Sequence, residues 1–376
     1  MNIQMVDLRS QYLKIKDEVD EAVLNCIDSA AFINGPSVNE FVSDLARYID
    51  CRHVIPCANG TDALQIAMMA LGLQQGDEII VPAFTYVATA EVIALLGLVP
   101  VLVDVHPGTF MLDVNDVTAK ITDRTKAIVP VHLFGQCADM ESLISLAKAH
   151  QLFIIEDTAQ AIGATYTFSD GYRGKAGVMG DIGCTSFFPS KNLGCFGDGG
   201  AIFTSNDEYA RRIKMIANHG QERKYYHDVV GINSRLDTLQ AAVLRVKLQH
   251  LDRYAISRNE AAAFYDNALS VLEEEMIIPQ RVSNSTHVFH QYTLKVKNGK
   301  RDQLKEYLQK NGIPTMIYYP LPLHFQKAYQ SDNYQPGSFP VAEVLCTEVL
   351  SLPMHTEMSE QELNFIVSNI KQFYSK

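Results

Sequence analysis

Tryptophan is absent from this chain of 376 residues, and it also lacks an excess of basic residues, paired cysteines and a long apolar run. A net charge of −11 argues against a general nucleic-acid or anionic-membrane surface. The seven cysteines include no CxxC pair and no metal-ligand spacing, so we expect reduced thiols and no metal site. The longest apolar run, at 92–103, is too short to span a bilayer. Because the N-terminus also lacks a signal-peptide design, we expect a cytoplasmic protein.

The length of the chain predicts more than one domain, because a single hydrophobic core stops growing below this size. A composition of 47% hydrophobic and 20% charged residues is typical of globular proteins. We expect a large domain at 1–250 and a smaller C-terminal domain at 251–376.

Short apolar segments rich in valine and isoleucine alternate with helical patterns over the first two hundred residues. Their nearly continuous apolarity is typical of strands covered on both faces, and the alternation indicates βαβ units. The sequence therefore predicts an α/β fold with a mostly parallel seven-stranded sheet between helices. The close spacing at 183–204 suggests a hairpin within this sheet. The expected strands are 53–57, 78–81, 99–104, 127–131, 152–156, 183–187 and 201–204.

A long helical pattern over 234–269 joins this region to the C-terminal part of the chain. Ser234, followed three residues later by Asp237, has the pattern of a helix start. Beyond it, a strand-like segment at 289–296 and a helical pattern at 301–310 predict a smaller α/β domain.

Lys191 and Asp157 have the surroundings that point most clearly to chemistry. Lys191 lies between an apolar and a glycine-rich segment, and Asp157 ends an apolar strand, where open α/β sheets bind ligands. A lysine amine forms a Schiff base with the aldehyde of pyridoxal 5′-phosphate (PLP), and a carboxylate keeps its pyridine nitrogen protonated. Singly, each residue has an ordinary interpretation, as an exposed lysine or as a helix N-cap. Together they predict a PLP site.

Other residues in the same region suit the remaining parts of this cofactor. A helix that starts at Thr61 or Asp62 would present free backbone N–H groups to a phosphate, although this motif alone favours a simple capped turn. The hydroxyl of Ser186 is a candidate for a second phosphate ligand. Tyr86 is a candidate to stack on the ring, and Gln160 to bind the phenolic oxygen.

In their order along the chain, these motifs resemble the DegT/StrS family of sugar aminotransferases, PLP enzymes of fold type I. The resemblance implies that Lys191 is catalytic and carries the cofactor, and that Asn233 reaches the cofactor phosphate of the neighbouring subunit. It therefore also implies a homodimer with shared active sites. The cofactor-binding residues that it implies are Gly60, Thr61, Asp62, Tyr86, Asp157, Gln160, Ser186, Lys191 and Asn233.

Within the family, the chain most resembles aminotransferases of UDP-2-acetamido-2-deoxy-3-oxo-glucuronate, which use L-glutamate, release 2-oxoglutarate and serve cell-surface polysaccharide (lipopolysaccharide) biosynthesis. One departure is Tyr318-Tyr319, where that group has a histidine-tyrosine pair. A dTDP-3-oxo-6-deoxyhexose aminotransferase therefore stays an alternative, as does a PLP-binding regulatory protein without turnover. Candidate substrate-binding residues are Arg235, Tyr318, Tyr319 and His324.

Overall fold

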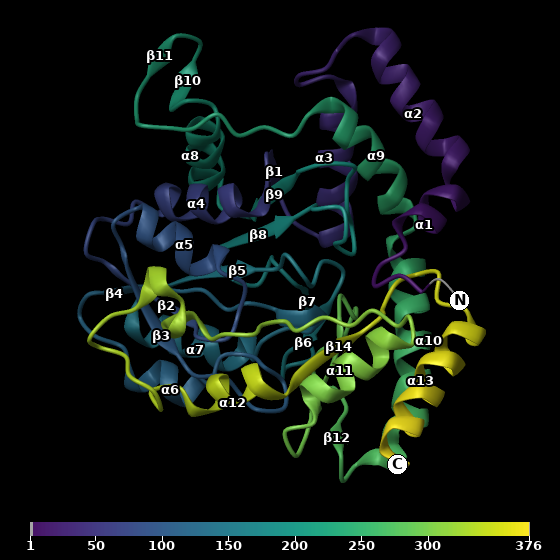
Figure 1. Ribbon diagram of the computed structural model, residues 1–376. Coiled ribbons are helices and arrows are strands. Elements are labelled where there is room, and N and C mark those ends of the chain that lie inside the picture. The colour runs from purple at the N-terminus through teal and green to yellow at the C-terminus, as the bar shows by residue number, and fades with distance from the viewer. Residues whose placement is uncertain (1–2, 376) are drawn as a thin grey trace.

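The computed structural model describes residues 3–375 and is built around a seven-stranded sheet (Figure 1). Strand β9 runs antiparallel to both of its neighbours, whereas the other adjacent pairs are parallel. The predicted mostly parallel sheet and its hairpin are therefore confirmed. In spatial order the strands are β1 (His53–Cys57), β9 (Gly200–Thr204), β8 (Ile182–Ser186), β5 (Phe153–Asp157), β4 (Thr125–Ile128), β2 (Glu78–Pro82) and β3 (Val99–Val103).

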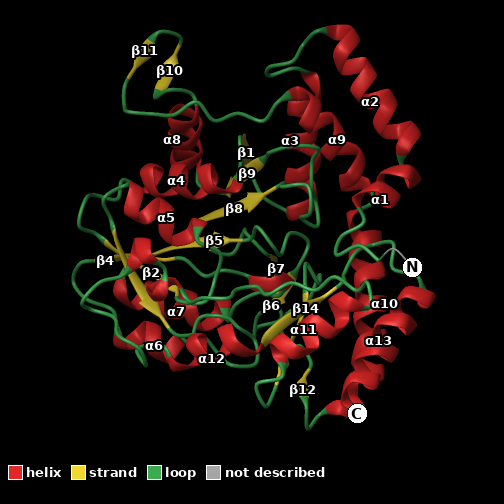
Figure 2. Cartoon of the chain, viewed as in Figure 1, coloured by secondary structure: helices red, strands yellow, loops and turns green. Residues whose placement is uncertain are grey.

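Helices cover both faces of this sheet, which explains the continuous apolarity of its strands. Helix α4 (Gly60–Leu71) and helix α7 (Met140–His150) both pack on β5, and Figure 1 shows them on opposite sides of it. In Figure 2 the helices surround the strands in this way throughout the large part of the molecule. Helices α5 (Ala88–Leu95) and α8 (Asp207–Ala217) contact α4, and helix α6 (Val114–Ala119) contacts α7.

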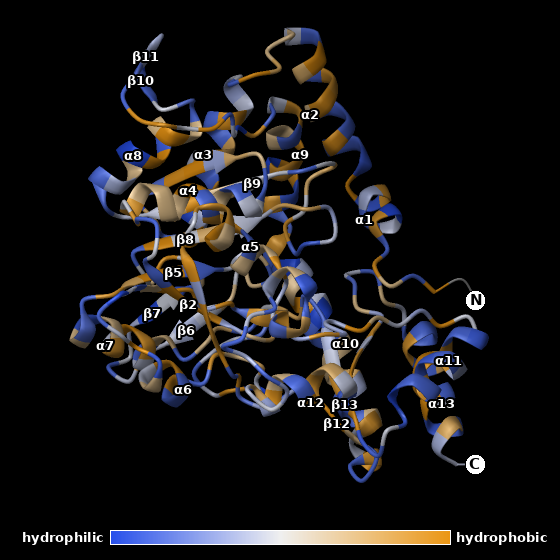
Figure 3. Cartoon of the chain, turned by 60° about the vertical axis from the view of Figure 1, so that its left-hand side comes forward, coloured by the Kyte–Doolittle hydropathy of each residue, from blue (hydrophilic) through white to orange (hydrophobic). Residues whose placement is uncertain are grey.

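The N-terminal helices pack on the side of the molecule next to β1. Helix α3 (Pro36–Ile49) and helix α2 (Lys16–Ser29) both contact α9 (Thr238–Gln249). Helix α1 (Leu8–Lys14) precedes them. Leu24 and Ile27 of α2 are apolar and exposed, and Figure 3 shows apolar stretches along this helix at the outer side of the molecule.

The C-terminal part forms a smaller α/β unit with its own hydrophobic core. Its antiparallel sheet contains β12 (Met276–Ile277), β13 (Tyr292–Val296) and β14 (Val349–Leu352). Helix α9 ends at Gln249 and helix α10 begins at Leu251, but the domain boundary at 250 stays a prediction. The helices of this unit are α10 (Leu251–Leu269), α11 (Arg301–Lys310) and α13 (Glu360–Tyr374). Helix α12 (Pro340–Glu348) also lies in the C-terminal part of the chain, but its buried residues join the core of the large part.

Short elements complete the described chain. The two-stranded hairpin of β10 and β11 projects from the body of the molecule in Figure 1. The short strands are β6 (Thr165–Thr167), β7 (Arg173–Lys175), β10 (Gln221–Arg223) and β11 (Tyr226–His227). The 3-10 helices are η1 (Leu133–Gly135), η2 (Ser270–Leu272), η3 (Leu323–Phe325) and η4 (Lys327–Tyr329).

The predicted helix start at Ser234 is wrong. Helix α9 begins at Thr238 with Asp237 as its N-cap. The hydroxyl of Ser234 instead donates to Asp62 Oδ2 at 2.6 Å and accepts the backbone N–H of Ala58 at 2.9 Å. A tertiary contact has therefore taken the group that would have capped the helix.

The described chain contains no helix that is long and apolar enough to cross a membrane. All seven cysteines lie within it, and each is buried with a free thiol. Burial raises the pKa of several of these thiols, including Cys57 and Cys137, which disfavours the reactive thiolate.

Candidate active site

A cavity of about 830 Å³ opens at the carboxyl ends of the central strands, between the large part and the C-terminal part. The start of α4, the end of β5 and the loop after β8 supply its walls on one side, and C-terminal segments supply the other. Ligands bind at this edge in open α/β sheets. Of the residues predicted from the sequence, it is lined by Gly60, Thr61, Asp62, Tyr86, Asp157, Gln160, Ser186, Lys191, Tyr318 and Tyr319.

Asp157 is the last residue of β5, and its carboxylate accepts hydrogen bonds from one hydroxyl and one backbone N–H group. Oδ2 accepts from the Thr89 hydroxyl at 2.9 Å, and Oδ1 accepts from the backbone N–H of Ala159 at 3.1 Å. Burial raises the pKa of Asp157, and these hydrogen bonds oppose that rise only in part. No cation forms an ion pair with the carboxylate within residues 3–375. A buried carboxylate of this kind favours a positively charged N–H partner.

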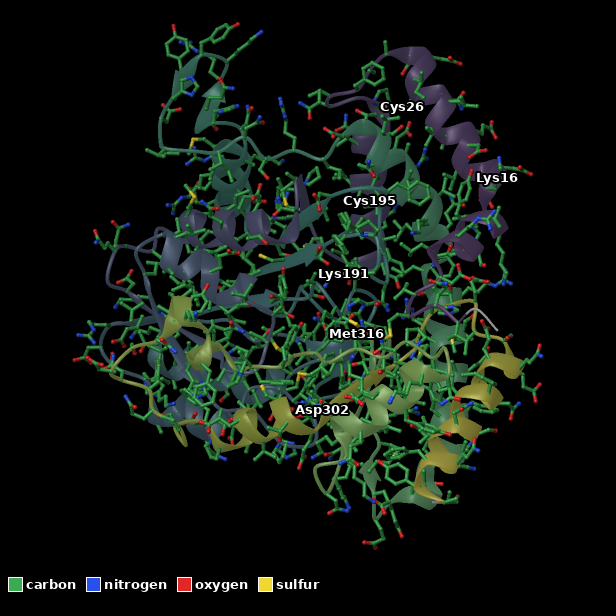
Figure 4. All side chains as sticks on the ribbon, in the orientation of Figure 1. Lys16, Cys26, Lys191, Cys195, Asp302 and Met316 are labelled. Atoms are coloured by element: carbon green, nitrogen blue, oxygen red, sulfur yellow. The ribbon has the colours of Figure 1, made fainter. Side chains whose placement is uncertain are left out.

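Lys191 lies in the loop after β8, near the centre of the molecule (Figure 4). Its backbone N–H donates to Phe188 O at 2.8 Å, and the buried Lys247 amine fixes the loop by donating to Gly194 O at 2.6 Å. The Lys191 amine itself has no hydrogen-bond partner in the described part of the chain. Burial lowers its pKa to about 8, against the opposing effect of Asp157. A useful fraction of the amine is therefore unprotonated, and nucleophilic, near neutral pH.

The start of α4 forms the third wall of the site. The Asn59 side chain accepts the backbone N–H of Asp62 at 2.8 Å, so the amide of Asp62 is already bonded. The N–H groups of Gly60 and Thr61 belong to the first turn and have no helical acceptor. A Cβ atom at Gly60 would lie 2.7 Å from Ser186 Cβ, so glycine allows the helix start to approach the Ser186 hydroxyl. Helix dipole and free N–H groups make this a suitable place for a phosphate.

Gln160 and the aromatic residues form the remaining wall. Gln160 Oε1 accepts the backbone N–H of Phe134 at 2.8 Å, and its Nε2 donates to the Tyr319 hydroxyl at 3.1 Å. The Gln160 amide therefore has a fixed orientation and one Nε2 hydrogen left for a ligand. Tyr86 is 58% exposed, and its ring centroid lies 6.2 Å from that of Tyr319. Both rings border the cavity, so they are placed to contact a flat ligand.

These groups fit the three distinctive parts of PLP. The free N–H groups of α4 suit its phosphate, the Asp157 carboxylate suits its protonated ring nitrogen, and the Lys191 amine suits its aldehyde. Each of these groups lines the same cavity, and each lacks a protein partner of the kind that PLP would supply.

Three predicted residues lie outside this cavity. Asn233 and Arg235 are exposed on the loop before α9 and do not line the cavity of their own chain. His324, predicted to contact the substrate, is also absent from the cavity lining, and its substrate role stays a prediction. Its ring is buried against Phe339, with Nε2 3.1 Å from Glu343 Oε1, where it joins the C-terminal segments to each other.

The structure also brings polar residues to the site that the sequence did not single out. Asn59 caps α4, Thr89 orients Asp157, and Asp198, His290 and Gln291 line the cavity. The only local signal for the last two is a pair of polar residues at the entrance to an apolar strand. That signal does not reveal which cavity they face.

The chain matches the model of the DegT/DnrJ/EryC1/StrS aminotransferase family over residues 13–371. It therefore belongs to this family, and it is an aminotransferase of the PLP fold-type I class.

Two curated relatives are similar over almost their whole length. A pleiotropic regulatory protein of Geobacillus stearothermophilus is 46% identical over 376 residues, covering 100% of this chain and 99% of the relative. The UDP-2-acetamido-2-deoxy-3-oxo-D-glucuronate aminotransferase of Pseudomonas aeruginosa is 45% identical, covering 97% of this chain and 98% of the relative. Among solved structures, S. venezuelae DesV in complex with a ketimine intermediate has a TM-score of 0.95 at 38% identity, covering 100% and 99% of the two chains.

The electrostatic link between Lys191 and Asp157 gives a first prediction. Substitution Asp157→Asn should lower the pKa of Lys191 below its value of about 8, because the carboxylate is the group that raises it. The pKa is measured on cofactor-free protein as the midpoint of the pH dependence of Lys191 acylation, with peptide mass spectrometry to separate the lysines. Acylation of exposed Lys310 in the same samples is the control. An unchanged midpoint for Lys191 would show that the two groups do not interact.

Proposed function

We propose that the chain catalyses PLP-dependent transamination of a nucleotide-linked 3-keto sugar, with L-glutamate as the amino donor and 2-oxoglutarate as the released acid. The observation that carries this proposal is that Lys191 and Asp157 line one cavity, beside the free N–H groups of α4. In the described chain, the Asp157 carboxylate has no ion-pair partner and the Lys191 amine has no hydrogen-bond partner, so both groups are available to a ligand. The aminotransferase relatives support the same reaction class.

Each residue then has a defined task. Gly60, Thr61 and Ser186 hold the phosphate, and Asp157 holds the protonated ring nitrogen. PLP, when bound, supplies an electron sink for the negative charge that develops on the substrate carbon. The Lys191 amine first holds the cofactor and then, once displaced by an amino substrate, moves the proton at that carbon. Its lowered pKa suits it to act as a base near neutral pH.

Two further side chains orient the ring. Gln160 offers its remaining Nε2 hydrogen to the phenolic oxygen, and its other hydrogen bonds keep the amide in that orientation. Tyr86 covers the ring from the open side of the cavity.

The charges at the cavity indicate that the substrate-binding site needs additional cations, and we propose that they come from another chain. The described lining includes the carboxylates of Asp62, Asp157 and Asp198 but only one side-chain cation, Lys191. A sugar nucleotide is anionic, so additional positive charge is required near it. We propose that Arg235 of the neighbouring subunit supplies this charge and pairs with a C6 carboxylate through two hydrogen bonds.

The sugar that we propose is UDP-2-acetamido-2-deoxy-3-oxo-glucuronate, for a pathway to cell-surface polysaccharide. Tyr318 and Tyr319 border the cavity and are placed to contact it. A dTDP-3-oxo-6-deoxyhexose is the alternative, and a dTDP-3-amino-3,6-dideoxy-galactopyranose transaminase of Aneurinibacillus thermoaerophilus, 40% identical, supports keeping it. The regulatory name of the Geobacillus relative supports a role without turnover less strongly than the cavity supports catalysis. The cavity of this chain contains both Lys191 and Asp157, the two groups that transamination requires.

We further propose a cytoplasmic homodimer. The exposed apolar residues of the N-terminal region, including Leu24 at 57% exposure and Ile27, are suited to a subunit interface. Exposed Asn233 and Arg235 would then reach the cavity of the partner rather than their own.

The function and its substrate are tested by comparing two keto sugars, each prepared in situ by the preceding pathway enzyme. With L-glutamate as donor, we expect kcat/KM to favour the UDP-linked uronate over dTDP-3-oxo-6-deoxyhexose. Substitution Arg235→Gln should reduce kcat/KM for the uronate about 10- to 150-fold, because it removes a charge-assisted hydrogen-bonded pair. The same variant should change use of the dTDP sugar little. Better use of the dTDP sugar by the unmodified protein would overturn the substrate assignment, and no turnover with either would oppose the function.

The shared site is tested by combining one inactive variant with one that has weakened cofactor binding, at a PLP concentration too low to saturate the second variant. Substitution Lys191→Ala removes the amine from one chain, and Asn233→Ala weakens phosphate binding in the partner's site. If sites are shared, co-expression of the two variants should restore about a quarter of the active sites, because half of the dimers are mixed and each contains one complete site. Activity no higher than that of the separate variants, or an active monomer in sedimentation, would contradict this arrangement.

A further inference from the structure

His290 and Gln291 are two polar residues of the cavity whose side chains have no hydrogen bonds. Each is 6% exposed, and both lie just before β13, in the C-terminal part of the chain. No donor or acceptor within residues 3–375 reaches either nitrogen of the His290 ring or the amide of Gln291, and His290 Nδ1 and Gln291 Oε1 are buried without a partner. Buried polar groups are nearly always hydrogen-bonded, so two adjacent exceptions at a cavity indicate a ligand.

The backbone of the same segment is, in contrast, firmly held. Buried Arg258 of α10, 2% exposed, donates from Nη1 to Phe289 O at 2.9 Å, to His290 O at 3.4 Å and to Met354 O at 3.1 Å. The neighbouring Asn259 amide donates to His287 O at 2.8 Å. A rigid backbone that carries two unpaired side chains is the arrangement of a prepared binding surface.

The chemistry of the pair narrows the class of ligand. Burial, together with the charges of Lys191 and Arg258, lowers the pKa of His290 well below its usual value, so its ring is neutral. A neutral imidazole and a carboxamide each offer one or two donors and an acceptor, without net charge. Such groups match hydroxyl and amide substituents better than a carboxylate or a phosphate, which would leave a buried charge uncompensated.

The cofactor has other partners for its own polar groups. Its phosphate, ring nitrogen and phenolic oxygen are matched by the start of α4, by Asp157 and by Gln160. The uncharged substituents of the sugar ring are left for the opposite wall, which the C-terminal part provides.

We propose that His290 and Gln291 are specificity-determining residues that hydrogen-bond the neutral hydroxyl and acetamido substituents of the sugar. This inference rests on the proposed function and deepens it, because it assigns recognition of the uncharged part of the substrate to the C-terminal wall.

The test separates the two half-reactions in purified, PLP-loaded protein. Substitutions Gln291→Leu and His290→Leu remove the hydrogen-bonding groups, His290→Asn retains a donor and an acceptor, and Gln309→Leu on the surface of α11 is the matched control. The glutamate half-reaction is followed by cofactor absorbance. The second half-reaction is measured with UDP-2-acetamido-2-deoxy-3-oxo-glucuronate.

We expect each leucine variant to raise KM for the sugar about 10- to 100-fold, because each leaves a substrate group unpaired. The glutamate half-reaction and cofactor retention should stay within about twofold of the unmodified protein, and His290→Asn should recover most of the sugar affinity.

An unchanged KM for the sugar in both leucine variants would overturn the inference while leaving the proposed function intact. Equal losses in the two half-reactions, or loss of the cofactor, would also overturn it, because the residues would then serve the cofactor or the fold. Failure of the unmodified protein to react with glutamate would overturn the proposed function and this inference together.

Discussion

The burial of an amine and a carboxylate at one cavity is the constraint on which the rest of this structure depends. Burial disfavours the charged form of each group, and for this reason the pKa of Lys191 is lowered and that of Asp157 raised. The charged form of each group stays unfavourable until a ligand provides a bonding partner that the protein lacks. A molecule that brings a cationic N–H to Asp157 and a carbonyl carbon to Lys191 relieves both costs at once, and the free N–H groups of α4 add a place for its anionic end.

The fold produces this arrangement by bringing together segments that are distant in sequence. Asp157 ends β5, Lys191 follows β8, and the parallel pairing of β5 with β8 places both ends at the same edge of the sheet. Helix α4 begins at that edge because Gly60 allows it to pack directly on Ser186. The C-terminal part closes the opposite wall. The catalytic groups therefore come from rigid elements, and the loop that carries Lys191 is fixed by buried Lys247.

Much of this was predictable from local sequence. The central strands are continuously apolar because both of their faces are covered, and this pattern does not depend on tertiary detail. Asp157 and Lys191 could be predicted because each is a polar residue that directly follows or interrupts an apolar segment. Other features depend on contacts that sequence spacing does not encode. Ser234 resembles a helix cap but bonds to Asp62, and His324 packs against Glu343 outside the cavity. His290 and Gln291 line the site on a segment whose backbone accepts a hydrogen bond from distant Arg258.

We propose that a single lysine, Lys191, bonds covalently to the cofactor, across the cavity from Asp157. The most direct test is to load the purified protein with PLP, reduce it with borohydride and map the modified residue by peptide mass spectrometry. We predict a stable phosphopyridoxyl adduct on Lys191 and on no other lysine at stoichiometric PLP. Absence of an adduct, or an adduct on another lysine with Lys191 unmodified, would contradict it.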